Sequence, residues 1–113
     1  MARHRKLHLF DINIPGGVTN MESDFVKHGP PNLTIFETEY CKIGIGICYD
    51  LRFPEYAQLL AQSGVQMICY PSNFSLKTGE MHFDILRKGR AVDNLSYVVT
   101  CGSGTNIDDK EVF

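Results

Sequence analysis

A cysteine at the end of a run rich in isoleucine and glycine is the side chain most suited to chemistry. Across residues 41–48 the isoleucines fall on one face of an extended strand, and the other face is bare backbone until Cys48. Bare backbone on a strand usually marks the close approach of another group. As the last strand residue before a turn and a helix, Cys48 would lie near a helix N-terminus, which favours the thiolate, and Arg52 would add positive charge. These features leave two interpretations open, a nucleophile and a small buried hydrophobic residue.

Three other polar side chains each allow a catalytic and a structural interpretation. Alternation puts Lys6 and His8 on one face of an extended segment, which is typical of a solvated basic edge. Glu22 follows in a polar loop, where a carboxylate is usually exposed. His82 belongs to the inner face of an expected helix, where a histidine is more often hydrogen-bonded in the core than a ligand. Pattern alone therefore favours the structural interpretation for each of them.

Strands and helices are expected to alternate after a loop-like start. Residues 33–38 and 41–48 are rich in β-branched and aromatic side chains, and the tight connection Glu39-Tyr40 between them predicts a hairpin. The order of the later elements predicts an α/β fold whose sheet is at least partly parallel. The expected elements are loops over 1–32 with one brief strand at Leu7, Leu9 and Phe10, the two strands of the hairpin, a helix over 53–62, a strand over 65–70, a helix over 80–94 and a strand over 97–101.

The two expected helices each carry an apolar stripe. Pro54 suits the first turn of the helix over 53–62, and Gly64 marks its end. Residues spaced as i, i+3 and i+4 share one face of a helix, so the spacing assigns the side that turns toward the sheet. The buried faces are predicted to hold Phe53, Tyr56, Ala57, Leu60 and Ala61 in the first helix and His82, Ile85, Leu86, Gly89 and Val92 in the second.

Composition places the chain among globular proteins and excludes several classes of function. Its 113 residues are 43% hydrophobic and 21% charged, which is enough apolar surface to form a core. No apolar run approaches the ~20 residues of a membrane span. A formal net charge of -2 argues against electrostatic capture of nucleic acid. The sequence therefore predicts neither a membrane nor a nucleic-acid partner.

Cysteines and histidines lack the spacing of metal ligands. Neither a C-x-x-C pair nor a pair of histidines on one helix face occurs, so we predict no metal and no cofactor. No apolar signal region follows the basic start, which predicts reduced thiols in a cytoplasmic protein, with a mitochondrial location as the alternative. The residues concerned are Cys41, Cys48, Cys69, Cys101, His4, His8, His28 and His82.

Three ordered motifs together resemble the nitrilase superfamily of carbon–nitrogen hydrolases, and within it most closely the omega-amidase branch. The run over 5–11 is similar to the lysine motif of that family, and the run over 46–55 is similar to its nucleophile motif. A third block extends from Tyr70 through the run over 90–94. The resemblance covers essentially the whole chain. It implies that residues 1–113 are part of a carbon–nitrogen hydrolase domain, a partial α-β-β-α sandwich that is incomplete at both ends.

The resemblance implies a cysteine amidase and a role for particular residues. Cys48 matches the nucleophile, which attacks an amide carbonyl, releases ammonia and forms a thioester that water hydrolyses. Lys6 matches the lysine that stabilises the oxyanion, and the backbone N–H of Tyr49 would be a second oxyanion donor. Glu22 matches a supporting glutamate of the family. Substrate-binding positions are expected at Asn73, Phe74 and Thr78.

One departure from the family concerns its general-base glutamate, which lies N-terminal to the lysine motif. Five residues precede Lys6 here, and none of them is acidic. Loss of a general base costs about 10²–10⁴ in rate. We therefore expect the chain in isolation to fold poorly and to be nearly inactive.

Three functional hypotheses remain open at this point. The first is an omega-amidase that acts on a short dicarboxylate monoamide such as 2-oxoglutaramate, with nitriles, carbamoylated amines and deaminated glutathione as other substrate classes of the superfamily. The second is a truncated, non-catalytic member that acts only through protein association, by the helix over 53–62 or the helix over 80–94. The third is an unrelated α/β binding domain. For the full-length enzyme the family implies a small-molecule amide substrate and a homo-oligomer.

Overall fold

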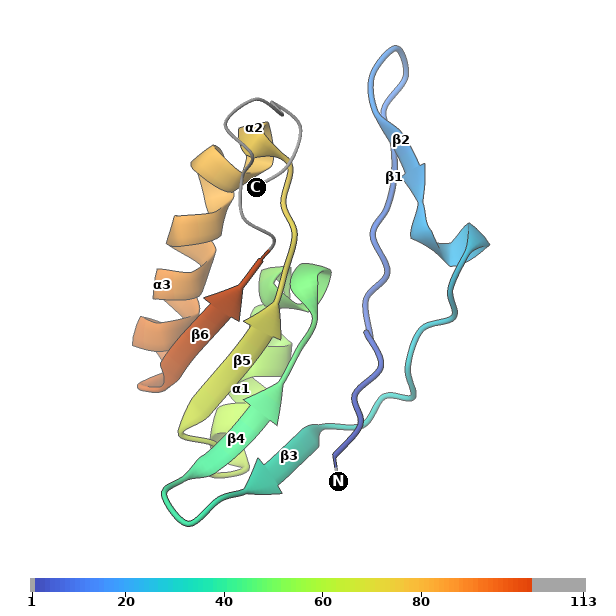
Figure 1. Cartoon of the computed structure of the whole chain (residues 1–113). Helices are drawn as coiled ribbons and strands as arrows, with labels where there is room; N and C mark the ends of the chain where they lie inside the picture. The colour runs from blue at the N-terminus through green and yellow to red at the C-terminus, as the bar shows by residue number, and fades with distance from the viewer. Residues whose placement is uncertain (1, 103–113) are drawn as a thin grey trace.

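A four-stranded mixed sheet forms the body of the molecule in the computed structural model, which describes residues 2–102 (Figure 1). The first two strands pair antiparallel, and the other neighbours pair parallel. The predicted hairpin and the predicted parallel crossovers are therefore confirmed. In sheet order the strands are β3 (Thr34–Glu37), β4 (Lys42–Ile45), β5 (Met67–Pro71) and β6 (Tyr97–Cys101).

Helices cover one face of this sheet (Figure 1). Helix α1 (Pro54–Gln62) connects β4 to β5, and α3 (Asp84–Asn94) lies between β5 and β6. The stripe predicted for the first helix is confirmed, because Tyr56, Ala57 and Leu60 are buried in α1. Within residues 2–102, no helix is long and apolar enough to cross a lipid bilayer.

Two glycines of the run over 41–48 explain why this stretch lacks side chains on one face. A Cβ atom at Gly44 would lie 2.9 Å from Cδ2 of Leu60 in α1. A Cβ atom at Gly46 would lie 2.3 Å from Cε1 of Tyr70 in β5, which real structures do not tolerate. The close approach that the sequence predicts is thus made by the helix and by a neighbouring strand.

The apolar core fills the space between the sheet and its helices. Its buried residues come from α1, from β5 and from the turns beside them, namely Leu51, Tyr56, Ala57, Leu60, Val65, Ile68, Tyr70 and Phe74. On the other face of the sheet the paired residues Phe36, Ile43, Met67 and Tyr97 form a row that no helix of residues 2–102 covers. One β layer and one α layer match the predicted partial α-β-β-α sandwich.

An extended segment, residues 2–32, runs alongside the body (Figure 1). It contains β1 (Asp11–Asn13), which pairs antiparallel with β2 (Thr19–Met21), and a 3-10 helix η1 (Glu22–Asp24). The brief strand predicted over residues 7–10 is wrong. The backbone there joins no sheet, because its amides at 7 and 8 bond to a side chain of the body.

The strand predicted over 41–48 is shorter than expected, since β4 ends at Ile45. Cys48 does not end this strand but begins a five-residue 3-10 helix, η2 (Cys48–Arg52). Helix α1 starts only at Pro54. The expectation that Cys48 ends the strand is therefore wrong, and the thiol stands at the start of a 3-10 helix that separates it from α1.

The helix predicted over 80–94 is broken near its start. A short α2 (Leu76–Thr78) leads into a π-helical turn η3 (Gly79–Phe83) before α3 begins. A π-helical turn holds more residues than an α-helical turn, so it shifts the phase of the stripe. Ile85 and Val92, predicted to face inward, are 71% and 72% exposed. Leu86 faces inward as predicted, and Phe83 and Arg90 complete the inner side.

Candidate active site

Cys48 has an unusual backbone conformation. Its φ angle is 47°, in the left-handed region that favours glycine, and such a conformation costs a non-glycine residue about 1–3 kcal/mol. The side chain is half-buried, and its thiol donates a hydrogen bond to the backbone oxygen of Asn73 at 3.3 Å. Cys48 follows β4 and Asn73 follows β5, so the thiol lies at the carboxyl ends of two parallel strands. In open α/β sheets this is the edge at which ligands bind.

Lys6 and Glu22 form an ion pair within the N-terminal segment. The distance from Nζ to Oε2 is 2.6 Å, and the same oxygen accepts a hydrogen bond from the backbone N–H of Phe10, also at 2.6 Å. The side chains of the pair are 12% and 28% exposed. The structural interpretations of the sequence, a solvated basic edge for Lys6 and an exposed loop carboxylate for Glu22, therefore do not describe this arrangement. A mostly buried ammonium is held in one place by a carboxylate that is itself fixed to the backbone.

The carboxylate of Asp50 connects this segment to the turn that contains the cysteine. Oδ2 accepts a hydrogen bond from Ile47 N at 2.9 Å and lies 3.5 Å from Leu7 N. Lys6 precedes Leu7 and Cys48 follows Ile47, so each stands one residue from an amide that faces the same oxygen. Two backbone segments that are far apart in the sequence, one with the predicted nucleophile and the other with the predicted oxyanion lysine, therefore meet at Asp50.

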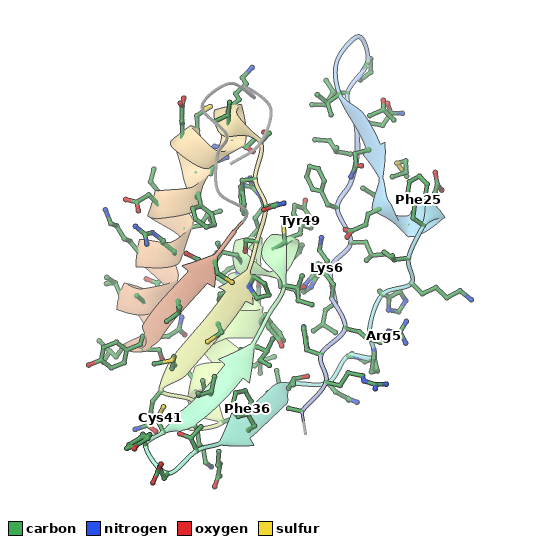
Figure 2. All side chains as sticks on the ribbon, viewed as in Figure 1. Arg5, Lys6, Phe25, Phe36, Cys41 and Tyr49 are labelled. Atoms are coloured by element: carbon green, nitrogen blue, oxygen red, sulfur yellow. The ribbon has the colours of Figure 1, made fainter. Side chains whose placement is uncertain are left out.

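Aromatic contacts support the same junction. The ring of His8 stacks on Phe53 with centroids 3.6 Å apart, and Phe10 meets Tyr49 edge-on at 5.1 Å. Figure 2 shows Lys6 on the N-terminal segment and Tyr49 on the part of the body that faces it. Stacking of this kind fixes ring orientation as well as burying apolar area. The segment is consequently held against η2 by rings as well as by hydrogen bonds.

A groove of about 410 Å³ lies beside this junction, between the N-terminal segment and α1. Its lining includes His8, Phe53 and Tyr56. Neither Cys48 nor Lys6 lines it. The groove therefore does not mark where a substrate would meet the thiol.

Arg90 of α3 holds the turn from its other side. The guanidinium is buried, and it donates to the backbone oxygens of Leu51 at 3.1 Å and Arg52 at 3.3 Å. These carbonyls belong to η2, whose short length leaves them without helical partners. The strained turn at Cys48 is thus held by a cation on one side and by Asp50 on the other.

Arg52, expected to add positive charge to the thiol, makes its contacts elsewhere. Its guanidinium nitrogens lie 3.4 and 3.5 Å from Nδ1 of His82, and the group stands 5.3 Å from the ring centre of Phe74. His82 is half-buried and has Arg52 as a hydrogen-bonding neighbour, as its structural interpretation predicts.

Among the predicted substrate-binding residues, Phe74 is buried in the core and Thr78 bonds to Ser75 at 2.8 Å. Asn73 is the one whose backbone contacts the thiol of Cys48.

Two other titratable groups differ from Cys48 in their surroundings. Burial raises the pKa of the Cys69 thiol, and its neighbours Cys101 and Cys41 add to the shift. Burial, with the nearby Asp50 carboxylate, also raises the pKa of Tyr56 to about 12. The Tyr56 hydroxyl donates to the backbone oxygen of Ile45 at 2.6 Å. Cys69 is therefore a weak nucleophile near neutral pH, and Tyr56 is a neutral donor that ties α1 to β4.

Sequence reasoning missed two residues that organise the site, Asp50 and Arg90. Each carried a signal. A carboxylate between Tyr49 and Leu51, directly after the apolar run over 43–48, indicates a buried hydrogen-bonding role. Arg90 lies seven residues after Phe83, which is the spacing of one helix face. The predicted inner face did not include this arginine.

Comparisons with known proteins agree on one family. The family model described as carbon-nitrogen hydrolase matches residues 1–109. Omega-amidase NIT2 of Bos taurus is 51% identical over 100 residues, which are 88% of this chain and 36% of the bovine protein. The protein of that name from Homo sapiens is 47% identical over 110 residues, 97% of this chain and 39% of the human protein. The crystal structure of Saccharomyces cerevisiae Nit3, a member of branch 10 of the nitrilase superfamily, matches with a TM-score of 0.79 at 41% identity, over 96% of this chain and 36% of that one. The chain thus spans little more than a third of the relatives that it matches.

Proposed function

Because this chain belongs to the carbon–nitrogen hydrolase family, we propose that residues 1–113 are part of the domain of an amidase of the omega-amidase type. Its substrate would be a short dicarboxylate monoamide such as 2-oxoglutaramate. One observation carries the proposal from the chain's own atoms. Oδ2 of Asp50 faces the amides next to both Cys48 and Lys6, which supports a site formed by this thiol and this ammonium.

The proposed reaction proceeds through an acyl-enzyme. The thiolate of Cys48 attacks the amide carbonyl, a C–S bond forms, and the carbonyl oxygen becomes an oxyanion. Lys6 and the backbone N–H of Tyr49 stabilise that oxyanion, while Glu22 holds the ammonium in place. The C–N bond then breaks, and ammonia leaves with the proton that the thiol gave to solvent when it ionised. Water attacks the thioester, which releases the carboxylic acid and restores the thiol.

The proposal assigns no general base within this sequence. No acidic residue precedes Lys6, where the family carries that glutamate. Amide turnover by the chain alone is expected to be slower by about 10²–10⁴ than with a base in place. An ester with a good leaving group tests the nucleophile without this requirement, because p-nitrophenolate leaves without taking a proton.

The experiment measures acylation of the 113-residue chain by the mono-p-nitrophenyl ester of glutaric acid. We expect nitrophenolate release of about one equivalent per chain, with the glutaryl group found by peptide mass spectrometry on Cys48. Cys48→Ser should abolish this burst, and Cys41→Ser should leave it unchanged. The p-nitrophenyl ester of butyric acid, which lacks the second carboxylate, should react more slowly if the site prefers a dicarboxylate. Acylation spread evenly over the four cysteines would refute the proposal.

Association without catalysis is the second candidate, and one observation favours it. Ile85 and Val92 on α3 are largely exposed apolar side chains, and Leu95 beside them is also exposed. Such a surface is suited to a homo-oligomer contact. Light scattering on the chain and on its Ile85→Ser variant would test this. A dimer lost in the variant, together with four equally slow thiols, would favour association over catalysis.

A further inference from the structure

Asp50 is a fully buried carboxylate at the junction of the two segments that carry the proposed catalytic groups. Among residues 2–102 no lysine or arginine forms an ion pair with it. A buried charge is stable only where hydrogen bonds replace its lost hydration. Backbone amides and the ring of His8 provide those bonds here, while the ring of His4 lies beside the carboxylate without a hydrogen bond to it. The identity of its partners therefore indicates what the carboxylate does.

The two oxygens of Asp50 divide their partners in a specific way. Oδ1 accepts from His8 N at 2.9 Å and faces Nδ1 of the same residue at 2.8 Å. Oδ2 accepts from Ile47 N at 2.9 Å and also faces Leu7 N and Nε2 of His4, both at 3.5 Å. Oδ1 thus binds only the N-terminal segment, and Oδ2 binds both this segment and the residue before Cys48. A single side chain spans the junction.

We propose that Asp50 is a positioning residue, whose carboxylate sets the place of Lys6 relative to Cys48. This inference rests on the function proposed above. Asp50 itself touches no reacting atom in the proposal, and it acts through the backbone at residues 7, 8 and 47.

The N-terminal segment needs such a positioning contact, because no strand pairing within residues 2–102 attaches it to the body. Strand β1 pairs with β2 and not with the sheet of the body, so no ladder fixes the register of residues 4–8 on η2. A further direct bond from this stretch to the body joins His4 Nδ1 to Thr34 Oγ1 at 2.9 Å. The amide beside Lys6 thus meets the body at Asp50. A shift of about 1 Å in a catalytic group can cost about a hundredfold in rate, so this contact controls the oxyanion donor.

Two reagents separate positioning from mere folding. Iodoacetamide alkylates Cys48 without forming an oxyanion, whereas mono-p-nitrophenyl glutarate acylates it through one. We expect Asp50→Asn to lower acylation about tenfold to a hundredfold, because the amide group of asparagine cannot accept on both sides. Alkylation should change less than about threefold, since it does not use Lys6. Glu39→Gln, an equal change at an exposed turn, should alter neither rate.

The decisive comparison is made in the Lys6→Met background. If Asp50 acts through Lys6, Asp50→Asn should cause no further loss of acylation once the ammonium is gone. An additive loss, or an equal loss with both reagents, would overturn the proposal. Failure of the wild-type chain to acylate at Cys48 would instead refute the proposed function, so the two failures are distinguishable.

A second variant decides the matter if Asp50→Asn does not fold. His8→Phe keeps a ring against Phe53 and removes only the contact at Nδ1. It should lower acylation by a smaller factor, about threefold to tenfold, with alkylation unchanged and with no further effect in the Lys6→Met background. Equal effects on both reagents, or no effect on either, would contradict the role of this contact.

Discussion

The body and the N-terminal segment are held in place by different interactions. In the body, residues 33–102, hydrogen-bonded ladders and an apolar core fix the strands and helices. In the segment, residues 2–32, the one ladder is internal, and the bonds to the body end on side chains, chiefly on Asp50. The proposed nucleophile therefore stands on a rigid scaffold, whereas the proposed oxyanion lysine stands on an attached arm.

The two kinds of interaction have different effects: the apolar core stabilises the body, and hydrogen bonds orient the N-terminal segment. Burial of apolar area is nondirectional, so a core tolerates small shifts of the elements that form it. Charge-assisted hydrogen bonds are directional and roughly twice as strong as neutral ones. The carboxylates of Glu22 and Asp50 thus orient the arm without adding a core to it. Loss of the Lys6 ammonium from the arm should affect chemistry more than folding, and changes in the apolar core of the body should do the reverse.

The largest expected effect comes from the lysine of the arm. Lys6→Met keeps the length of the side chain and removes its charge, so acylation of Cys48 by mono-p-nitrophenyl glutarate should fall about 10²–10³-fold. Lys27→Met, an exposed lysine of the same segment, should react like the wild-type chain. Stopped-flow release of nitrophenolate measures both. Equal rates in the two variants would mean that the ammonium of Lys6 does not act on the oxyanion.

In the body, the largest loss of unfolding free energy is expected where the packing is tightest. Gly46→Ala places a methyl group against Tyr70, at 2.3 Å before any relaxation, and should cost about 1–3 kcal/mol of unfolding free energy. Gly89→Ala is the matched change, because nothing lies within 4 Å of its new methyl group. In a helix this substitution should stabilise by about 0.5–1 kcal/mol. Urea unfolding of the two variants tests the contrast, and a neutral Gly46→Ala would show that the strands are more adaptable than the geometry indicates.

Two ion pairs sharpen the comparison further. Lys6–Glu22 is mostly buried, whereas Lys42–Glu37 at the edge of the sheet has side chains that are 43% and 68% exposed. Glu22→Gln should cost about 1–2 kcal/mol, because the carboxylate also accepts from Phe10 N–H. Glu37→Gln should cost no more than about 0–1 kcal/mol. Faster hydrogen exchange at the Phe10 amide in Glu22→Gln alone is the expected observation, and equal exchange in the two variants would contradict it.

Prediction from the sequence succeeded where structure is local. The hairpin of β3 and β4 and the buried face of α1 follow from alternation and helical spacing over a few residues. The inner face of α3 was predicted correctly at Leu86 but wrongly at Ile85 and Val92, because a π-helical turn before the helix changed the phase. Periodicity assumes an unbroken helix, and residues 79–83 do not form one.

The candidate site was less predictable, because its parts are joined by contacts between distant residues. The family resemblance indicated Cys48, Lys6 and Glu22, and their catalytic roles stay predictions. The contact that brings their segments together depends on Asp50, whose partners lie 42 and 43 residues away in the sequence. No local pattern specifies the partner of a buried carboxylate, even where its burial can be suspected from apolar neighbours.

The smallest expected effect concerns the bond that ties α1 to β4, and it distinguishes the body by its response to pH. Because burial raises the pKa of Tyr56 to about 12, the unfolded chain releases this proton first, near pH 10. The contribution of the neutral phenol to stability is therefore complete below about pH 10 and is lost progressively as the pH rises toward 12. Tyr56→Phe should cost about 1 kcal/mol at neutral pH by removing the bond to Ile45, and should make unfolding free energy less sensitive to alkaline pH.

Tyr40→Phe, at a side chain that is 85% exposed, should change neither quantity. Urea unfolding at about pH 8 and about pH 10.5 measures the difference. Burial also raises the pKa of Tyr70, so the alkaline loss should be reduced rather than abolished, and an unchanged loss in Tyr56→Phe would mean that Tyr56 does not contribute to it.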